Sequence, residues 1–243
     1  MHSNSLHQVP QTTALPLSAL ASSADGGFTI HATRSGSLSE MAQRLVIQRY
    51  AQRGYLRMPW SSATEPQLLT LSASGAAGTL GTLGVRLDSA QGLKADEAFP
   101  EEMRVLRAQG LRLCEFTQLA LEHGITSVNV LAGLFHAAHL YAHQVNEVEL
   151  LVIEVNPRHV AYYRRMLGFT VASEERLNPR VQAPAVLMCL DLAYAQQQID
   201  SLGGARNAGL TRSLYPHFFG PEEQAGLLDR LFCQLESQAR QAA

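Results

Sequence analysis

The chain has 243 residues, of which 46% are hydrophobic and 16% are charged, and its formal net charge is −2. This length and apolar content suit one domain of roughly 150–200 residues with a real core, plus tails. The nearly neutral balance excludes the basic footprint of a nucleic-acid-binding protein, so we expect no nucleic-acid partner.

The cysteines and the N-terminal segment predict a cytoplasmic protein. The three cysteines are Cys114, Cys189 and Cys233, and an odd count with two inside apolar runs indicates reduced thiols. No apolar run approaches the ~20 residues that a membrane span needs. The N-terminus lacks the basic start and long apolar centre of a signal peptide. Residues 1–27 are rich in Ser, Ala, Thr and Pro, and we expect a disordered or loosely ordered arm there.

The first half of the remaining chain predicts strands and helices in turn. Residues 28–33 alternate between apolar and polar as a strand does. A helix is expected next, with Ser39 as its N-cap and Gly54 at its end. The runs "QLLTLSAS" and "GTLGVRLDS" are separated by "GAA", which is typical of a hairpin. A short helix is expected to begin after Pro100 and to end at Gly110.

The second half predicts four more strands and two helices, followed by a helical tail. "LRLCEFTQLALE" favours a strand, and apolar residues at helical spacing follow between positions 131 and 145. "EVELLVIEV" is an almost continuous apolar run, which indicates a central strand covered on both faces. A short helix ending at Gly168, two strands and two helical pieces complete the chain. The order predicts an α/β protein with a mixed (α+β) sheet and helices on its faces.

Three motifs in this order resemble a known family. The strand "EVELLVIEV", the break at Pro157 and the helix ending in "LGF" resemble the second half of the GNAT acyltransferase fold. "GTLGVRLDSAQGLKADEAFPEEMRVLRAQGLRLCEFTQLAL" followed by "VNPRHVAYYRRMLGF" is similar to the long-chain N-acyl amino acid synthases, which are GNAT-fold relatives of the acyl-homoserine lactone synthases. The resemblance runs from about residue 28 to 191. It implies an acyltransferase domain over residues 28–192 and a helical extension over residues 193–243 that packs on it.

The resemblance also implies a reaction. A fatty acyl group would pass from an acyl carrier protein to the amino group of an amino acid, with a phosphopantetheine-linked thioester as donor and no tightly bound cofactor. The thioester would lie where "VELLVIEV" and the strand before it splay apart. Two alternatives stay open: a coenzyme A-dependent N-acyltransferase acting on another amine, and a non-catalytic module that binds acyl groups or carrier proteins.

Two residues are candidates for the base. The ammonium of an amino acid must lose a proton before its nitrogen attacks the thioester. The resemblance assigns this role to Glu115, whose apolar neighbours would desolvate it and raise its pKa. The alternative for Glu115 is an ion pair with an Arg on the sheet face. His159, just past Pro157, would serve as a second base or proton relay. The alternative for His159 is a capping or packing role at the start of the helix.

The resemblance implies further contacts to the donor. A backbone N–H near Leu119 would stabilise the oxyanion of the intermediate. The expected acyl and pantetheine contacts are Leu121, Gly124, Ser127 and Tyr163. In the common pattern, the Tyr that serves the leaving thiolate lies four residues before the Gly. Here that position is Arg164, so Tyr162, Tyr163 or Arg164 would take the role.

Two departures from the common pattern bear on the substrates. The loop "EHGITSVN" has the single glycine Gly124 and is a poor cradle for pyrophosphate, which favours a carrier protein with one phosphodiester over coenzyme A. Gln118 stands where the synthases tend to show Arg, three residues after the Glu. If that Arg binds the acceptor carboxylate, Gln118 leaves the identity of the acceptor, or activity itself, open.

Two charged groups on the predicted helices complete the candidates. Arg158, Arg164 and Arg165 would dock an acidic carrier protein, or would simply form a solvated helix face. The spacing of His136, His139 and His143 fits zinc in principle, but no Cys or acidic residue is in step with them. We therefore expect a polar shoulder on that helix and no metal.

Overall fold

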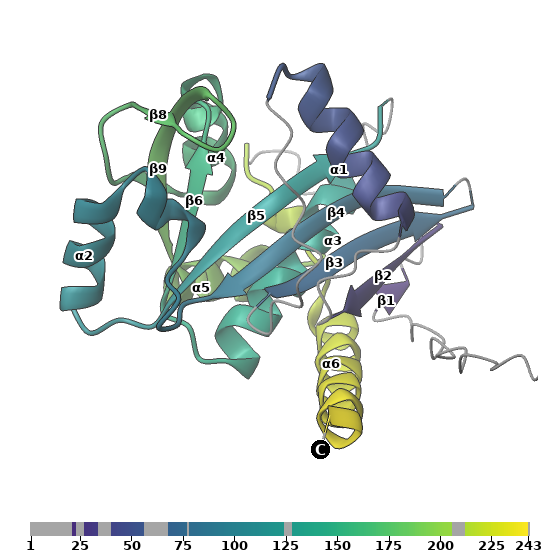
Figure 1. The fold of residues 1–243 in the computed structure, drawn as a ribbon. Helices are drawn as coiled ribbons and strands as arrows, with labels where there is room; N and C mark the ends of the chain where they lie inside the picture. The colour runs from purple at the N-terminus through teal and green to yellow at the C-terminus, as the bar shows by residue number, and fades with distance from the viewer. Residues whose placement is uncertain are drawn as a thin grey trace, which may run out of the picture.

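The computed structural model describes residues 21–22, 27–33, 40–55, 68–76, 78–123, 128–205 and 212–242. A nine-stranded sheet forms its centre, in the order β1-β2-β3-β4-β5-β6-β9-β7, and β8 pairs with β9 outside this path (Figure 1). The strands are β1 (Ala21–Ser22), β2 (Phe28–Thr33), β3 (Leu68–Gly75), β4 (Gly78–Leu87), β5 (Leu113–Leu121), β6 (Leu150–Val155), β7 (Thr170–Val171), β8 (Arg176–Asn178) and β9 (Ala183–Asp191). The mixed sheet confirms the predicted fold class.

Helices cover both faces of the sheet. In Figure 1, α1 lies in front of the sheet, whereas α3 and α5 lie behind it. The α-helices are α1 (Glu40–Gln52), α2 (Pro100–Ala108), α3 (Val128–His139), α4 (Val160–Leu167), α5 (Leu192–Leu202) and α6 (Pro221–Ala242). The other helical turns are the 3₁₀ segments η1 (Lys94–Glu97), η3 (Pro157–His159) and η4 (Tyr215–His217), and a π-helical turn η2 (Leu140–Val145) that continues α3.

The N-terminal boundary and β8 differ from the sequence prediction. Ala21 pairs with Ile30 and Ser22 with Thr29, so the sheet begins inside the segment that was predicted to be a loose arm up to residue 27. These small residues carry little local strand signal, and the pairing with β2 forms the strand. Strand β8 is only three residues long and was not predicted. The expected N-cap Ser39 lies outside the described residues.

Strands β5 and β6 part as they run. Their parallel pairing extends from Leu113↔Leu150 to Glu115↔Val152, and beyond this point the two strands separate. Figure 1 shows β5 and β6 diverging from a common start. The splayed strands that the sequence resemblance implied are therefore present.

A bulge in β5 accompanies this parting. The β4–β5 register shifts so that Gln118 and Leu119 lie opposite Leu83 alone. Gln118 has a φ of 54°, in the left-handed region that non-glycine residues seldom adopt. A β-bulge bends its strand and increases the local twist, so the bulge directs β5 away from β6.

Two hydrophobic cores lie on opposite faces of the sheet. Leu151 and Ile153 of β6 belong to the larger core with α3, whereas Val152 belongs to a second core with Phe99 and Met103. Both faces of β6 are thus covered, as its apolar run predicted. Because side chains alternate along a strand, Glu154 points to the same face as Val152.

The end of α4 follows the sequence prediction, and helices α5 and α6 pack against the larger core. Gly168 ends α4 in the left-handed conformation with a φ of 82°, and Phe169 is buried after it. Ile199 of α5 and Leu227 of α6 are buried in the larger core. No disulfide links the three cysteines, all of which lie in the described part of the chain.

No described helix combines the length and the apolar character that crossing a bilayer requires.

Candidate active site

A cavity of about 150 Å³ occupies the space between the parted strands. Residues 115–119 of β5 and 153–155 of β6 form two of its walls. The lining also includes Lys94 and Arg180 from one side of the sheet and Phe135 and Tyr163 from the other. The cavity is therefore reached by side chains from both faces, at the point where the sheet hydrogen bonds between β5 and β6 end.

The structure brings together about half of the site residues that the sequence singled out. Those that line the cavity are Glu115, Gln118, Leu119, His159 and Tyr163. Leu121 packs against the larger core instead and is not part of the lining. The side chains of Arg158, Arg164 and Arg165 are exposed on η3 and α4, outside the lining. Gly124 and Ser127 lie outside the described residues.

Glu115 is a buried carboxyl group with a fixed orientation. Its side chain is 1% exposed, and Oε2 accepts a hydrogen bond of 2.7 Å from the backbone N–H of Lys94. Burial, together with the nearby Glu154 carboxyl, raises the pKa of Glu115 to about 8. Desolvation thus acts as the sequence predicted, and no direct ion pair with an Arg is needed to hold the side chain.

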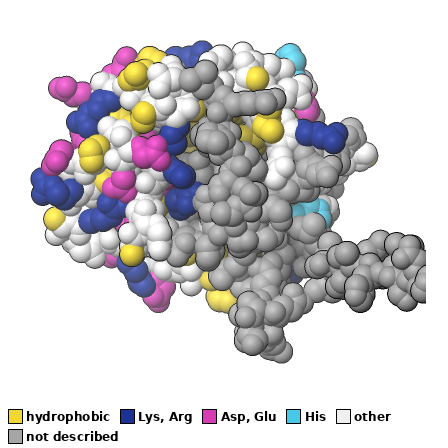
Figure 2. Space-filling view, in the orientation of Figure 1, with side chains coloured by type: hydrophobic (Ala, Val, Ile, Leu, Met, Phe, Trp, Pro, Cys, Tyr) yellow, Lys and Arg dark blue, Asp and Glu magenta, His cyan; other side chains and the backbone are white. Residues whose placement is uncertain are grey.

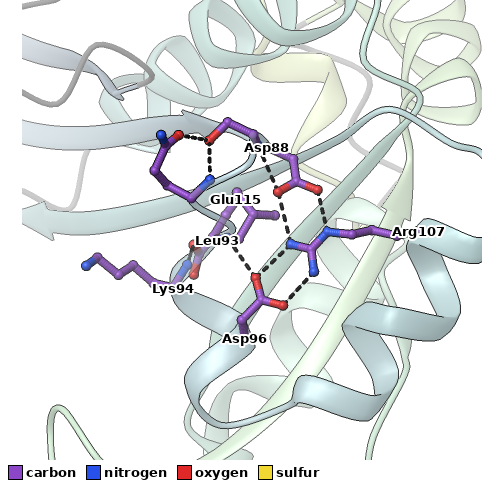
Figure 3. A network of polar contacts seen from close by, with 8 residues as sticks. Asp88, Leu93, Lys94, Asp96, Arg107 and Glu115 are labelled. Carbon is purple, nitrogen blue, oxygen red and sulfur yellow. Dashed lines mark hydrogen bonds and ion pairs between the residues drawn. The ribbon is translucent and has the colours of Figure 1, made fainter.

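A separate network fixes the backbone that binds Glu115 (Figure 3). Asp96 Oδ2 accepts from the N–H of Leu93 at 2.8 Å, and Arg107 joins Asp96 to Asp88 with N–O distances of 2.6 and 2.7 Å. This clamp holds η1, and so holds the Lys94 amide against Glu115. Sequence reasoning missed the clamp because its three charged residues become partners only through the tertiary fold.

Glu154 is the second buried carboxyl group of the cavity. Arg180 Nη2 donates to its Oε2, and Asn178 Nδ2 donates to its Oε1 at 2.9 Å. Burial raises the pKa of Glu154, and the Arg180 charge opposes the rise. Sequence reasoning missed this group as well. The available signal was a lone acidic residue in a central apolar strand, but its partners come from β8 and the loop after it, which were not predicted.

His159 lines the cavity in a neutral state. Burial, and then the charges of Arg158 and Arg53, lower its pKa. Its Nε2 accepts a hydrogen bond of 3.2 Å from Arg158 Nε. A neutral imidazole of this kind is able to relay a proton.

Tyr163 lies among aromatic side chains at the cavity wall. Its ring centroid is 6.5 Å from that of Phe135 and 5.6 Å from that of Phe169. Burial raises the pKa of the phenol, so it keeps its proton at neutral pH and can donate a hydrogen bond. Of the candidates for the leaving thiolate, Tyr163 lines the cavity, whereas Arg164 and Tyr162 are exposed.

Gln118 combines backbone strain with an unsatisfied amide oxygen. Its Oε1 is buried and has no hydrogen-bond partner within the described parts of the chain. A left-handed non-glycine residue costs about 1–3 kcal/mol, and an unpaired buried acceptor costs about as much. Both features concentrate where a ligand is bound, and a ligand N–H would satisfy this oxygen.

The three histidines on α3 and η2 serve the core. His136 Nδ1 accepts from the Phe219 N–H at 3.0 Å, His139 contacts Gln196 and His143 contacts a backbone carbonyl oxygen. His136 and His139 are buried, so the predicted polar shoulder is wrong for them, because α5 and the segment after η4 cover this flank. Among the described residues, no group of three or more His, Cys, Asp or Glu side chains is placed to hold a metal ion.

Comparison with known proteins agrees with this geometry. Residues 41–191 match the protein family described as N-acyl amino acid synthase FeeM. The solved structure of FeeM, an N-acyl amino acid synthase from uncultured soil microbes, is similar with 26% sequence identity and a TM-score of 0.62, over 70% of this chain and 93% of FeeM.

A second solved structure shares the fold. The coenzyme A-dependent acyl-homoserine lactone synthase BjaI, determined with MTA, has 14% identity and a TM-score of 0.50, over 71% of this chain and 89% of BjaI. No curated protein matches the sequence. These similarities confirm the GNAT-like acyltransferase fold that the sequence predicted.

Proposed function

Because this chain belongs to the FeeM family of N-acyl amino acid synthases and is an N-acyltransferase, we propose that it transfers a long-chain fatty acyl group from an acyl carrier protein to the amino group of an amino acid. The observation that carries the proposal is the cavity between the parted strands, with the buried Glu115 carboxyl in its wall. Such a slot holds a thioester next to a group that accepts a proton from the attacking amine.

The reaction needs two proton transfers. Ionised Glu115 takes one proton from the ammonium of the acceptor, and the freed nitrogen attacks the thioester carbonyl carbon. This attack forms the C–N bond and gives a tetrahedral intermediate, and the C–S bond breaks as the intermediate collapses. The second proton of the nitrogen passes through His159 or Tyr163 to the leaving thiolate, and Glu115 releases the first proton to solvent. The products are an N-acyl amino acid and the free thiol of the carrier.

Backbone groups at the bulge would stabilise the oxyanion. Gln118 and Leu119 lie at the register shift of β5, on the side of the strand that β6 has left. Fixed N–H dipoles at such a place stabilise charge as it develops, because they need no reorganisation. We assign this role to the backbone N–H at Leu119.

The acceptor would bind on the side of the cavity near Gln118. An amino-acid ammonium offers the N–H donor that the unpaired Gln118 Oε1 lacks. Gln118 would then recognise the nitrogen of the acceptor rather than its carboxylate, which is the role that an Arg at this position would have.

The carrier protein would dock on the exposed arginines of η3 and α4. Arg158, Arg164 and Arg165 flank His159 and Tyr163 in sequence, and both of these line the cavity. Carrier proteins are acidic, so a basic surface here steers them towards the cavity mouth. Figure 2 shows Lys and Arg side chains mixed with Asp and Glu on the described part of the face it draws. We therefore define the proposed docking surface by Arg158, Arg164 and Arg165.

The cavity volume bears on the acyl chain. At about 150 Å³ it is smaller than the roughly 300–1,000 Å³ of typical ligand pockets. It accommodates the reacting groups, and a long acyl chain has to extend beyond it.

The test is a product assay with paired donors. The purified protein is incubated with acyl carrier protein or with coenzyme A carrying the same fatty acyl group, plus a pool of amino acids and their decarboxylated amines. Mass spectrometry should detect N-acyl amino acids formed from the carrier-bound donor. Faster transfer from coenzyme A would replace the donor assignment, and saturable carrier binding without any product would favour a non-catalytic binding module.

A further inference from the structure

Glu115 and Glu154 face each other across neighbouring strands. Glu115 pairs with Val152 at the last position of the β5–β6 ladder, and Glu154 lies two residues further along β6 on the same face. Both side chains line the cavity. The side chain of Glu154 is 9% exposed, so the two carboxyl groups share one nearly dry environment.

A chain of hydrogen bonds links the two carboxyl groups through one residue of η1. The Lys94 N–H donates to Glu115 at 2.7 Å, and the Lys94 carbonyl oxygen accepts from Arg180 Nη1 at 2.5 Å. Arg180 in turn donates to Glu154, whose second oxygen is bound by Asn178. Glu154 is therefore held by Arg180, by Asn178 and by a side-chain hydrogen bond with Glu115 itself. Glu115 Oε2 also accepts from the Lys94 amide.

We propose that Glu154 is a positioning residue for the base. Its carboxylate, fixed by Arg180 and Asn178 beside Glu115, makes Glu115 basic enough to take a proton from the ammonium of the acceptor. This inference rests on the proposed function. In the step concerned, an N–H bond of the ammonium breaks, its proton goes to the Glu115 carboxylate and an O–H bond forms. No oxidation or reduction is involved.

The pKa values of the acceptor ammonium and of an ordinary Glu explain why Glu115 needs a carboxylate such as Glu154 beside it. The α-amino group of a peptide has a pKa of about 8, that of a free amino acid is higher, and an ordinary Glu has a pKa of about 4.3, so transfer to an ordinary Glu is unfavourable by a factor of at least roughly 10³–10⁴. Burial and the Glu154 charge bring the pKa of Glu115 to about 8, which removes most of this mismatch.

Other charged and titratable groups also face Glu115. They are Arg86 of β4, Lys94 of η1, Arg180 after β8, and Tyr50 and Arg53 of α1 and its C-terminal end, whereas Glu97 of η1 faces Arg180 and Glu154. Arg86 and Arg180 lower the proton affinity of Glu115. Glu154 is the acidic side chain that opposes them, which makes it the group to change.

The first measurement follows the Glu115 carboxyl directly. Carbon-13 NMR of Glu-labelled protein, assigned by comparison with Glu115→Gln, should show Glu115 titrating near pH 8. In Glu154→Gln this titration should move down by about one to two pH units, because a negative neighbour is lost while Arg180 remains. Glu97→Gln is the matched control. It removes an exposed carboxylate from the same Arg180, 3.3 Å away, and should leave the Glu115 titration in place.

The second measurement follows catalysis at saturating substrates. In Glu154→Gln the pH of half-maximal kcat should move down together with the NMR titration, and the plateau above it should fall about tenfold, since a weaker base transfers the proton less readily. A purely structural role would lower kcat without moving its pH dependence.

The outcomes separate this inference from the proposed function. An unchanged Glu115 titration in Glu154→Gln overturns the inference, and so does loss of all turnover at every pH, which would make Glu154 the base. If Glu154→Gln does not fold, Glu154→Asp must give a smaller shift in the same direction, and no shift overturns the inference. If the wild-type protein acylates no amine, the proposed function fails, whereas the NMR titration still decides how the two carboxyl groups are coupled.

Discussion

Two networks lie close together in this molecule, and in each of them an arginine binds carboxylates. A carboxyl pKa is lowered in the first network, whereas carboxyl pKa values are raised in the second. In the first, Arg107 joins Asp88 and Asp96, and its side chain is 34% exposed. There the hydrogen bonds from Arg107, and then that from the Leu93 amide and the Arg107 charge, lower the pKa of Asp96. In the second, Arg180 binds Glu154 beside the 1% exposed Glu115, and burial raises the pKa of both carboxyl groups.

The comparison shows that burial, and not residue type, separates a structural network from a reactive one. Around Arg107, both carboxylates hydrogen-bond directly to the guanidinium and keep contact with solvent, and the charged form of Asp96 is favoured. Around Arg180, the guanidinium pairs with Glu154 and with the exposed Glu97, whereas Glu115 does not pair with it and lies in a dry site between the Lys94 amide and Glu154. The first arrangement holds η1, and the second produces a group suited to proton transfer.

Glu115→Gln should give the largest effect on turnover. It removes the base, so kcat should fall by roughly 10²–10⁴-fold. Retention of the wild-type rate in a folded Glu115→Gln variant would contradict the assignment. His159→Ala, which removes the second candidate base, should be compared in the same assay.

The same substitution should alter how stability depends on pH. The folded pKa of Glu115 is about 8 against an ordinary 4.5, so its contribution to stability is complete below pH 4.5 and is lost as pH rises to about 8. Glu115→Gln should lack this decline and be at least as stable at pH 8. Urea unfolding at pH 5 and pH 8 measures the difference, and an equal decline in both proteins would mean that Glu115 is ionised in the fold.

Arg164→Glu should give the next largest effect, through the donor. Reversing one charge on the proposed docking surface should raise KM for the acyl carrier protein about tenfold, with less effect on kcat, and high salt should reduce the difference. Arg104→Glu is the matched control, because Arg104 is equally exposed on α2 and pairs only with its helix neighbour Glu101 among the described residues. Equal increases in KM from both variants would show that net charge, and not this surface, controls binding of the carrier protein.

Tyr163→Phe should have a smaller effect. A pantetheine thiolate is a moderate base and a good leaving group, so loss of the phenol proton should lower kcat by less than about tenfold. Tyr162→Phe, on the exposed side of α4, should leave kcat unchanged. A loss of 10³-fold or more in Tyr163→Phe would make the phenol as important as Glu115 and would require a different account of the proton path.

Arg107→Gln should have the smallest effect on turnover and a clear effect on stability. It breaks the charge-assisted hydrogen bonds to Asp88 and Asp96, which should lower the free energy of unfolding by about 1–3 kcal/mol. Turnover should change by only a few-fold, since Glu115 itself is intact. The exposed pair of Arg112 and Glu147 is the control, and Arg112→Gln should cost less than about 1 kcal/mol. A loss of turnover as large as that of Glu115→Gln would erase the distinction between the two networks.

The sequence predicted those parts of the site that depend on local pattern and motif order. The apolar run of β6, the exit of α4 at Gly168 and the position of Glu115 on β5 all follow from residues near in sequence. The partners of Glu115 do not follow from residues near it in sequence. Lys94 contributes through its backbone, and Asn178 and Arg180 lie next to a strand of three residues that pairing, rather than propensity, creates. Gln118 was identified as a departure in side-chain type, but its left-handed backbone depends on the register shift with β4.

A crystal structure with a non-hydrolysable acyl-pantetheine analogue would test the central claim most directly. The account predicts that the carbonyl group that replaces the thioester lies between β5 and β6, with its oxygen near the Leu119 amide and the Glu115 carboxyl on the opposite side. An analogue bound outside this gap, with β5 and β6 paired beyond Glu115 and Val152, would contradict it.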